Sequence, residues 1–295
     1  MVYTMPSTPK KTAAKTGKIA FQGRAGAYSH TACLTAFPKL EPLPCPSFAD
    51  AFHAAETGRA DFAMIPIDNS IAGRVADIHN LLPASPLSIV AEHFIPVHHC
   101  LLGVAGAKID DVKTVYSHVH ALPQCKKFIA EHKLKPVVFE DTAGSAARVA
   151  EMNDPAHGAI ASALAADLYG LKVLKRNIED ESGNTTRFIV LAKTRSLPAP
   201  ARGVKYMTSL IFKVRNIPAA LYKALGGFST NGINITKLES YLEGNKFHSA
   251  RFYCEVEGHP EDIAFEHAMD ELRFFAADVR MLGTYPRHGY RDSVK

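Results

Sequence analysis

The stretch Asn184-Thr185-Thr186-Arg187-Phe188-Ile189-Val190-Leu191 places two hydroxyls and a guanidinium directly before an apolar run. The run 188–192 is long enough to cross a buried sheet, so the polar residues before it are predicted to lie at the sheet edge. Open α/β folds bind ligands at such an edge, and these groups suit a small anion. A plain loop-to-strand entry is the alternative, because Thr-Thr is also common strand composition.

Short apolar runs alternate with amphipathic segments from Lys18 to about Lys193. This alternation is typical of α/β folds and predicts helices on both faces of a mostly parallel sheet. Helix starts are expected at Ser47 and Thr142, whose side chains suit N-caps. The predicted strands cover residues 19–21, 62–67, 88–96, 114–116, 137–139, 158–161 and 188–192.

Two long segments are predicted to cross between two halves of this α/β region. Residues 87–104 form an extended stretch that leads out of the first half, and residues 172–187 carry the chain back. The result is two lobes, roughly 18–93 plus 176–195 and 94–175, with a ligand cleft between them as in periplasmic binding proteins. One continuous doubly wound sheet is the alternative.

A Pro/Ala/Arg-rich stretch at residues 196–205 is predicted to be a linker to a second domain, 206–285. Its pattern predicts the ferredoxin-like order βαββαβ, and an exposed sheet edge of such a domain favours pairing with a second copy. The expected strands are 206–214, 234–242, 246–256 and 279–282, the helices 218–230 and 261–276, with a turn at 243–245. Residues 286–295 are expected to be a tail.

Composition excludes several classes of protein. With 295 residues, 47% hydrophobic and 21% charged, the chain has the balance of a globular protein with room for two domains. Residues 1–17 are Lys-rich without an apolar block and are predicted to be a disordered basic tail. A secretory signal and an apolar run of ~18 residues are both missing, so we expect a cytoplasmic protein without membrane contact. Scattered basic residues give no support for nucleic-acid binding.

Cysteine and histidine spacing gives no sign of a cofactor. The five cysteines are odd in number and never spaced as C-x-x-C, so reduced thiols are expected. The histidine pairs 98–99 and 118/120 lack carboxylates at ligand spacing. We therefore expect neither a metal nor a cofactor.

Polar or glycine-rich turns follow predicted strands at residues 23–29, 66–70, 117–125, 141–146 and 184–188. Helix capping explains any single turn, but five such turns favour a shared cleft. The first resembles an anion site formed by backbone N–H groups at a helix start and lacks the nucleotide motifs. The expected substrate-binding residues are Ala27, Ser29, Asn69, Ser70, Ser117, His118, Gln124, Thr142, Ser145, Thr185, Arg187 and Phe188.

Taken together and in order, these segments resemble a bacterial prephenate dehydratase followed by an ACT regulatory domain, over residues 18–287. The matching segments are 21–23 with 28–29, 65–70, 116–118 with 124–125, 141–142 with 145–146, and 184–188. Two departures stand out. The family's Pro-Ile-Glu-Asn has Asp68 in place of the glutamate, and its Glu-Ser-Arg-Pro effector motif reads Glu-Ser-Tyr-Leu at residues 239–242.

The resemblance implies prephenate as the substrate and a reaction that expels CO2 and water to make an aromatic ring, without redox cofactor or metal. It also assigns the family's essential threonine to Thr186, which we expect to donate a hydrogen bond to the leaving oxygen. A threonine hydroxyl has too high a pKa to be a full acid, so water or a neighbour such as His118 must return its proton. Arg187 is expected to clamp a carboxylate or, alternatively, to form a structural ion pair. Phe188 is expected to form the apolar wall of the cleft that packs against the substrate ring.

Feedback by phenylalanine through the second domain is the further implication, and it requires a homodimer or homotetramer with two quaternary states. The family's Gly-Ala-Leu element resembles residues 219–221. The expected effector-binding residues are Pro218, Ala219, Ala220, Leu221, Asn231, Gly232, Asn234, Glu239 and Ser240. Arogenate dehydratase, which performs the same chemistry on the transaminated substrate, is the near alternative. A binding protein without activity is the distant one.

Overall fold

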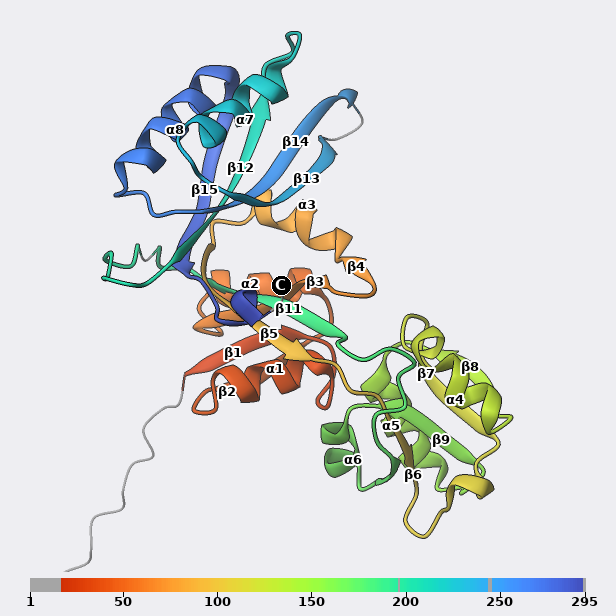
Figure 1. The fold of residues 1–295 in the computed structure, drawn as a ribbon. Helices are drawn as coiled ribbons and strands as arrows, with labels where there is room; N and C mark the ends of the chain where they lie inside the picture. Colours follow the sequence, from red (N-terminus) through yellow and green to blue (C-terminus); the bar gives the residue numbers. More distant parts are fainter. Residues whose placement is uncertain (1–16, 196, 244–245, 294–295) are drawn as a thin grey trace, which may run out of the picture.

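The computed structural model describes residues 17–195, 197–243 and 246–293, whose strands form three sheets (Figure 1). Residues 1–16 of the expected tail 1–17, residue 196 of the linker, residues 244–245 of the predicted turn and residues 294–295 of the expected C-terminal tail lie outside the described residues. In the described part of the chain, no helix is long and apolar enough to cross a membrane. All five cysteines are buried free thiols.

The first sheet has the order β2-β1-β3-β11-β5, with the short β4 paired to β3. Helix α1 covers one face, where Ala32 and Cys33 join the core of Ile19 and Phe188, and α2 and α3 cover the other. The strands are β1 (Lys18–Gln22), β2 (Glu41–Cys45), β3 (Phe62–Asn69), β4 (Gly73–Arg74), β5 (Ser88–Pro96) and β11 (Thr185–Ala192). The helices are α1 (Tyr28–Ala36), α2 (Phe48–Glu56) and α3 (Ala76–Ala84).

The second sheet has the order β10-β6-β9-β7-β8 and forms the other lobe. Its strands are β6 (Cys100–Gly103), β7 (Thr114–His118), β8 (Lys135–Phe139), β9 (His157–Ala161) and β10 (Lys172–Lys175). Its helices are α4 (Lys126–Glu131), α5 (Thr142–Met152) and α6 (Ala163–Tyr169), with the 3-10 turns η1 (Ile109–Asp111) and η2 (Leu122–Cys125). Helix α5 begins at Thr142 as expected, but the N-cap expectation is corrected: Asp141 caps the helix, because its side chain accepts from the Gly144 N–H at 2.6 Å.

The chain crosses between the lobes twice, from β5 to β6 and from β10 back to β11, so two sheets replace the single doubly wound sheet. The expectation of mostly parallel sheets is wrong. Strand β1 is parallel to β2 and β3, and β7 to β8 and β9, but β11 is antiparallel to β3 and β5. Strand β6 is likewise antiparallel to β9 and β10. After each crossing, the first strand of the segment (β6 or β11) runs opposite to its neighbours β9 or β3.

The third sheet has the order β13-β14-β12-β15 with two helices on one face, which confirms the ferredoxin-like βαββαβ domain. Its elements are β12 (Tyr206–Val214), α7 (Ala220–Thr230), β13 (Ile235–Glu243), β14 (Lys246–Glu257), α8 (Ile263–Phe275) and β15 (Ala276–Pro286). The other face packs onto the first lobe. Met207, Tyr253 and Leu282 share one buried core with Ile78 of α3 and Ile89 of β5.

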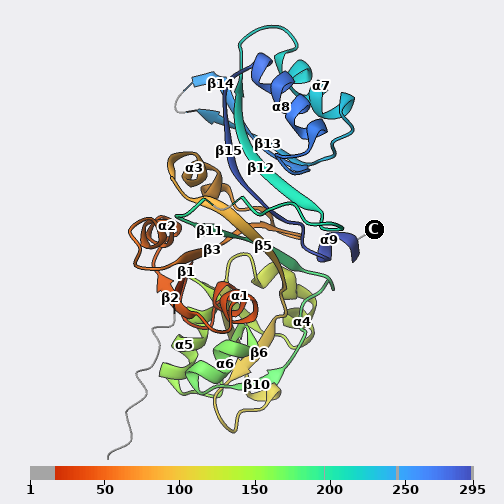
Figure 2. The ribbon, with the colours of Figure 1, turned by 90° about the vertical axis from the view of Figure 1, so that its left-hand side faces the viewer.

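The close approach of the third sheet to β5 depends on Gly283 in β15. A Cβ atom at Gly283 would overlap the backbone of Ile89, including its carbonyl oxygen. The absence of a side chain therefore allows two backbones to meet where β15 crosses β5. After β15 the chain turns back over the first lobe, where the short helix α9 (Tyr290–Ser293) lies beside β5 (Figure 2).

We predict that Gly283→Ala lowers the free energy of unfolding by about 2–3 kcal/mol, the usual cost of overpacking where backbone atoms must move. Gly226→Ala is the matched control, because a Cβ atom at this position of α7 would meet nothing within 4 Å. Its higher helix propensity should leave stability unchanged or raise it by up to about 1 kcal/mol. Urea unfolding of the three proteins checks this, and equal losses for both variants would contradict the close approach.

Candidate active site

The end of β3 and the start of β11 bring Asn69 and Thr186 side by side, since the two residues are partners in the strand register. The Asn69 Nδ2 group donates to Thr186 Oγ1 at 2.9 Å and to Asn184 Oδ1 at 2.7 Å. The Asn69 Oδ1 atom accepts from the N–H groups of Ile71 and Ala72, which fixes the orientation of the amide. Because Thr186 Oγ1 accepts from Asn69, its own hydrogen is left to donate to a ligand.

A chain of polar side chains runs from Asn184 into the second lobe. Asn184 Nδ2 donates to Gln124 Oε1 at 2.6 Å, and Gln124 Oε1 lies 3.0 Å from His99 Nε2. His99 Nδ1 in turn lies 2.8 Å from the hydroxyl of Tyr28 in α1. Asn184 and His99 are almost completely buried. This lobe-bridging network (Asn69, Asn184, Gln124, His99 and Tyr28) therefore ties Thr186 to both crossings and to η2 of the second lobe.

His99 is held neutral by its surroundings. Burial lowers the pKa of His99 below its ordinary value, although the hydrogen bond with Gln124 and the charge of Glu179 act in the opposite direction. A neutral imidazole between Gln124 and Tyr28 serves to orient its neighbours and carries no charge for a substrate carboxylate.

The turn before α1 is fastened to the second lobe, and it lines a pocket between the lobes together with Asp141 and Tyr169. The carbonyl of Gly26 accepts from Ser162 Oγ at 2.6 Å, and that of Ala25 accepts from the Tyr169 hydroxyl at 2.8 Å, both from the second lobe. The Ala27 N–H, expected to hold an anion, donates instead to the Arg24 carbonyl at 3.1 Å. The expectation for Ala27 is therefore corrected, because this N–H completes the turn.

Three further expected substrate contacts are corrected by the structure. The hydroxyl of Ser117 donates to the Ile160 carbonyl at 2.6 Å, and that of Ser145 to the Asp141 carbonyl at 2.8 Å. Both hydroxyls are fully buried and complete the protein's own hydrogen bonding. Phe188 is 1% exposed and belongs to the core under α1, so it cannot form the wall of a cleft.

The remaining candidates lie at strand ends of the two lobes. His118 and Thr142 are half-buried in the second lobe, and burial lowers the pKa of His118. Ser29 is buried in the first turn of α1. Ser70 Oγ accepts from the Thr185 N–H at 3.0 Å and donates to the Gly183 carbonyl at 3.2 Å, so it fastens β11 to the turn after β3.

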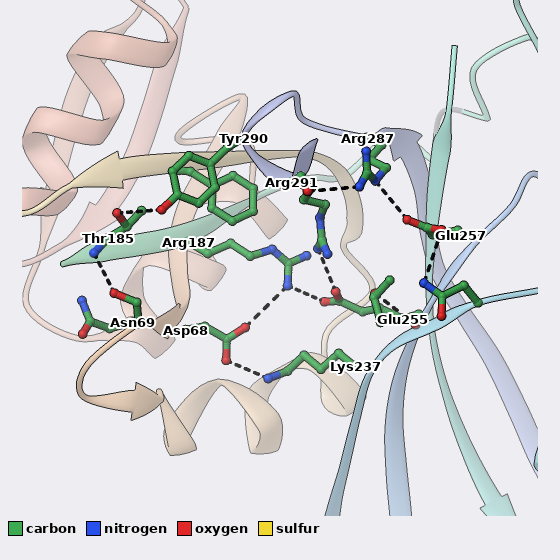
Figure 3. A pocket seen from close by; sticks show the side chains of 14 residues that line it. Asp68, Asn69, Thr185, Arg187, Lys237, Glu255, Glu257, Arg287, Tyr290 and Arg291 are labelled. Carbon is green, nitrogen blue, oxygen red and sulfur yellow. Dashed lines mark hydrogen bonds and ion pairs between the residues drawn. The ribbon is translucent and has the colours of Figure 1, made fainter. Parts of the chain in front are cut away.

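Arg187 and Thr185 face away from this cleft, because successive side chains of a strand point to opposite faces. Figure 3 shows Arg187 directed at the third sheet. Its Nε lies 2.9 Å from Glu92 Oε2 and its Nη1 lies 2.7 Å from Glu255 Oε1, and both glutamate side chains are completely buried. Arg187 is thus a structural ion-pair residue, and the expectation that it clamps a substrate carboxylate is corrected.

Charge compensation keeps Glu255 ionised. Burial alone would raise the pKa of Glu255, but the charges and hydrogen bonds of Arg187 and Arg291 outweigh it and hold that pKa below its ordinary value. Asp68, the position that departs from the family pattern, pairs with Lys237 at 2.7 Å and with Arg187 at 3.5 Å. Asp68 therefore contributes to the junction with the third sheet, where a cavity of about 520 Å³ lies.

Sequence reasoning missed Asn184, His99 and Tyr28 as members of the site. Asn184 is the first residue of the stretch 184–191, but an asparagine before a strand is equally typical of an ordinary loop. His99 was considered only as a metal ligand, and no group of three His, Cys, Asp or Glu side chains in the described ranges could hold a metal ion. Their role depends on partners far away in the sequence, such as Gln124.

Comparison with known proteins identifies close relatives. The model of the prephenate dehydratase family matches residues 19–196. A bifunctional N-acyl-homoserine lactone acylase/prephenate dehydratase of Komagataeibacter europaeus is 49% identical over 273 residues, covering 92% of this chain and 97% of that protein. Arogenate dehydratase/prephenate dehydratase 1 of Arabidopsis thaliana is 40% identical over 283 residues, covering 91% of this chain and 72% of that protein.

Solved structures share the fold. One described as a novel type of quorum quenching acylase has a TM-score of 0.87 and 48% identity, covering 92% of this chain and 99% of its own. Prephenate dehydratase from Arthrobacter aurescens, in complex with L-Phe, has a TM-score of 0.83 and 29% identity, covering 92% of this chain and 90% of its own.

We predict that Arg187→Met lowers the free energy of unfolding by about 3–5 kcal/mol, because it leaves a buried carboxylate without its partner. Arg24→Met is the control. Arg24 forms exposed ion pairs with Glu140 and Asp141, so its loss should cost less than about 1 kcal/mol. Denaturant unfolding measures both. A variant of unchanged stability whose substrate KM alone rises would restore the substrate-clamp interpretation.

Proposed function

This chain belongs to the prephenate dehydratase family, whose members are lyases, and we propose that it converts prephenate to phenylpyruvate by expelling water and CO2. The observation that carries the proposal is the placement of Thr186. Its hydroxyl accepts from Asn69 and keeps its hydrogen for a ligand, at the sheet edge between two lobes. A buried polar network holds that arrangement from both lobes.

The chemistry requires help for a departing hydroxide, while formation of the aromatic ring supplies the driving force. Thr186 donates to the leaving oxygen, and the bond from Asn69 orients and polarises the hydroxyl as negative charge develops. The lobe-bridging network ties the orientation of Thr186 to the relative position of the lobes, so the donor is set before the substrate reacts. Water or His118 returns the proton.

Anchors for the two substrate carboxylates must come from groups other than Arg187. The first turn of α1, beginning at Tyr28 and including Ser29, presents backbone N–H groups and the positive end of the helix dipole. Arg24, about half exposed, lies in the turn before α1, where it pairs with Glu140 and Asp141 beside a pocket between the two lobes. Gln124 lies in η2 of the opposite lobe, where its Oε1 atom is held by Asn184 and His99.

Two other activities remain as candidates. Arogenate carries an ammonium in place of the keto group of prephenate, and the name of the Arabidopsis relative includes both substrates. The name of the Komagataeibacter relative adds deacylation of N-acyl-homoserine lactones, which its 49% identity over nearly its whole length favours as a second function.

The deciding experiment incubates the purified protein separately with prephenate, arogenate and an N-acyl-homoserine lactone. Phenylpyruvate, phenylalanine and the free fatty acid are the respective products. Faster formation of phenylpyruvate from prephenate supports the proposal, and faster formation of phenylalanine moves the substrate to arogenate. An enzyme that turns over neither ring substrate contradicts the dehydratase proposal.

We predict that Thr186→Val, which keeps the side-chain shape and removes the hydroxyl, lowers kcat by about 10²–10³-fold while KM changes little. Thr186→Ser keeps the hydroxyl and should lose much less, within about tenfold. Steady-state kinetics of both variants on the better substrate distinguishes a donor from a packing residue. Equal losses for Val and Ser would show that the methyl group matters and the hydroxyl does not.

We further propose that phenylalanine binds the ferredoxin-like domain that contains the third sheet, called the third domain below, and regulates the enzyme. The L-Phe complex of the Arthrobacter relative supports this proposal. The expected effector residues 218–221 and 231–234 lie at opposite ends of α7, which is 11 residues and therefore about 16 Å long. One small ligand does not reach both ends within a chain. We propose a site shared by two chains of a homodimer or homotetramer.

Two details of the effector segments bear on the strength of regulation. Ala219 has φ of 58°, a left-handed conformation that suits the glycine of the family's Gly-Ala-Leu element better than alanine. Glu239 pairs with Arg74 of β4 at 3.2 Å and with Lys237 at 3.2 Å. The Glu-Ser part of the effector motif, residues 239–240, therefore contacts the hairpin formed by the end of β3 and β4.

We predict that phenylalanine inhibits the enzyme and that Glu239→Gln raises the inhibitory concentration about tenfold, because it removes a charge pair between the effector motif and β4. Glu266→Gln, an exposed position on α8, is the control and should leave inhibition unchanged. Titration calorimetry and inhibition assays check both effects. A full-length protein without any heat of phenylalanine binding would overturn the regulatory proposal.

A further inference from the structure

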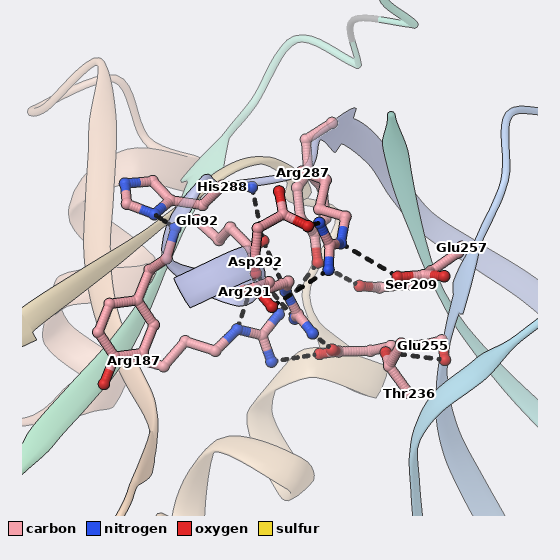
Figure 4. A network of polar contacts seen from close by, with 12 residues as sticks. Glu92, Arg187, Ser209, Thr236, Glu255, Glu257, Arg287, His288, Arg291 and Asp292 are labelled. Atoms are coloured by element: carbon pink, nitrogen blue, oxygen red, sulfur yellow. Dashed lines mark hydrogen bonds and ion pairs between the residues drawn. The ribbon is translucent and has the colours of Figure 1, made fainter. Parts of the chain in front are cut away.

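The C-terminal segment, residues 287–293, is built into the interior of the protein although its sequence resembles a tail. The side chains of Arg287 and Arg291 are only 11% and 16% exposed. Figure 4 shows the segment folded over the junction between the first and third sheets. A chain end that buries two guanidiniums is held in place by specific partners.

Arg291 completes a ring of four charges, of which Glu92, Arg187 and Glu255 are buried and Arg291 is partly exposed. Its Nε lies 2.8 Å from Glu92 Oε1, and its Nη2 lies 2.9 Å from Glu92 Oε2 and 3.1 Å from Glu255 Oε2. Arg187 contacts the same two glutamates from the other side. Each guanidinium thus bridges Glu92 of β5 and Glu255 of β14, so the ring joins the catalytic lobe to the regulatory domain.

The ring needs both arginines for its charge balance. The side chains of Glu92 and Glu255 are completely buried, and Arg187 alone neutralises one of the two carboxylates. An uncompensated carboxylate in this interior is strongly unfavourable, so loss of Arg291 forces the junction to open or to take up water or a proton. Either change acts directly on Arg187, the neighbour of Thr186.

Tyr290 holds the other neighbour of Thr186. Its ring stacks on Phe94 of β5 with centroids 4.6 Å apart and an interplanar angle of 17°, and its hydroxyl donates to Thr185 Oγ1 at 3.1 Å. The backbone N–H of His288 adds a bond to Glu92 Oε1 at 3.1 Å. The segment therefore fixes β11 on both sides of the residue that carries the chemistry.

We propose that Tyr290 and Arg291 are positioning residues, through which the C-terminal segment holds Thr186 in its productive orientation. The catalytic part of this inference rests on the proposed function. The segment acts from the face of β11 opposite to the cleft, so it touches no substrate. Its effect on turnover passes through Thr185, Arg187 and the strand itself.

Kinetics of full-length variants provides the first test. Tyr290→Phe keeps the stacking on Phe94 and removes only the bond to Thr185, and it should lower kcat about three- to tenfold with KM within twofold. Arg291→Met should lower kcat at least tenfold, whereas Arg291→Lys, which keeps the charge, should stay within threefold of the wild type. Tyr222→Phe and Arg273→Met, at exposed positions of the third domain, are the controls. Variants that match their controls in kcat overturn the inference.

A second measurement separates positioning from general destabilisation. If Tyr290 and Arg291 act through Thr186, their substitution in a Thr186→Val background should lower the residual rate less than twofold further. A loss of the same factor in both backgrounds would show that the segment acts on overall folding, and the inference would fail.

Hydrogen exchange tests the structural part without turnover. In Tyr290→Phe and Arg291→Met, peptides covering 185–192 should exchange at least fivefold faster than in the wild type, while peptides covering 135–139 in the second lobe should be unchanged. An enzyme inactive on both ring substrates that shows this pattern retains the structural role and loses only the proposed function. Unchanged exchange at 185–192 overturns the positioning role whatever the activity.

Discussion

The arrangement of the domains depends on the ring of charges formed by Glu92, Arg187, Glu255 and Arg291. Removing two carboxylates and the Arg187 guanidinium from water is costly, and the cost is offset only while every buried charge has its partner at hydrogen-bonding distance. The four residues come from β5, β11, β14 and α9. Moving any one of these segments would leave the charges on the others buried without a partner, and this cost opposes the movement.

Successive side chains of β11 point to opposite faces of the first sheet, so neighbouring residues of this strand have different partners. Arg187 faces the third domain, so Thr186 must face the opposite side, where it bonds with Asn69. The same geometry places Asp68 and Asn69 on opposite sides of β3, with Asp68 bound to Lys237 and Asn69 bound to Thr186. Both strands that carry the candidate active site are therefore in contact with the third domain through the residue next to the functional one.

Local pattern predicted most strands and the order βαββαβ, because hydrophobic periodicity and turn residues are local properties. The direction of the crossing strands and the partner of each polar side chain are not local. Ser117 follows a predicted strand as a ligand-binding residue would, but its hydroxyl donates to the Ile160 carbonyl, 43 residues later. Arg291 follows a polar stretch that resembles any tail, and its partner Glu92 lies 199 residues earlier. The Thr-Thr-Arg pattern points to β11 as the candidate strand but does not tell which of its side chains faces Asn69 and which faces the third sheet.

The same contacts limit how a regulatory signal can travel. Packed interfaces with paired charges switch between discrete arrangements, because a partial shift leaves charges buried and unpaired. The third domain touches the first lobe at the ring beside Thr186 and again at Glu239 with Arg74, in the hairpin that follows Asn69. A movement of that domain that breaks one of these contacts also displaces the other. Asn69 and Thr186 would therefore shift together. We infer that regulation acts on the orientation of the Thr186 hydroxyl, which would lower turnover before it weakens substrate binding.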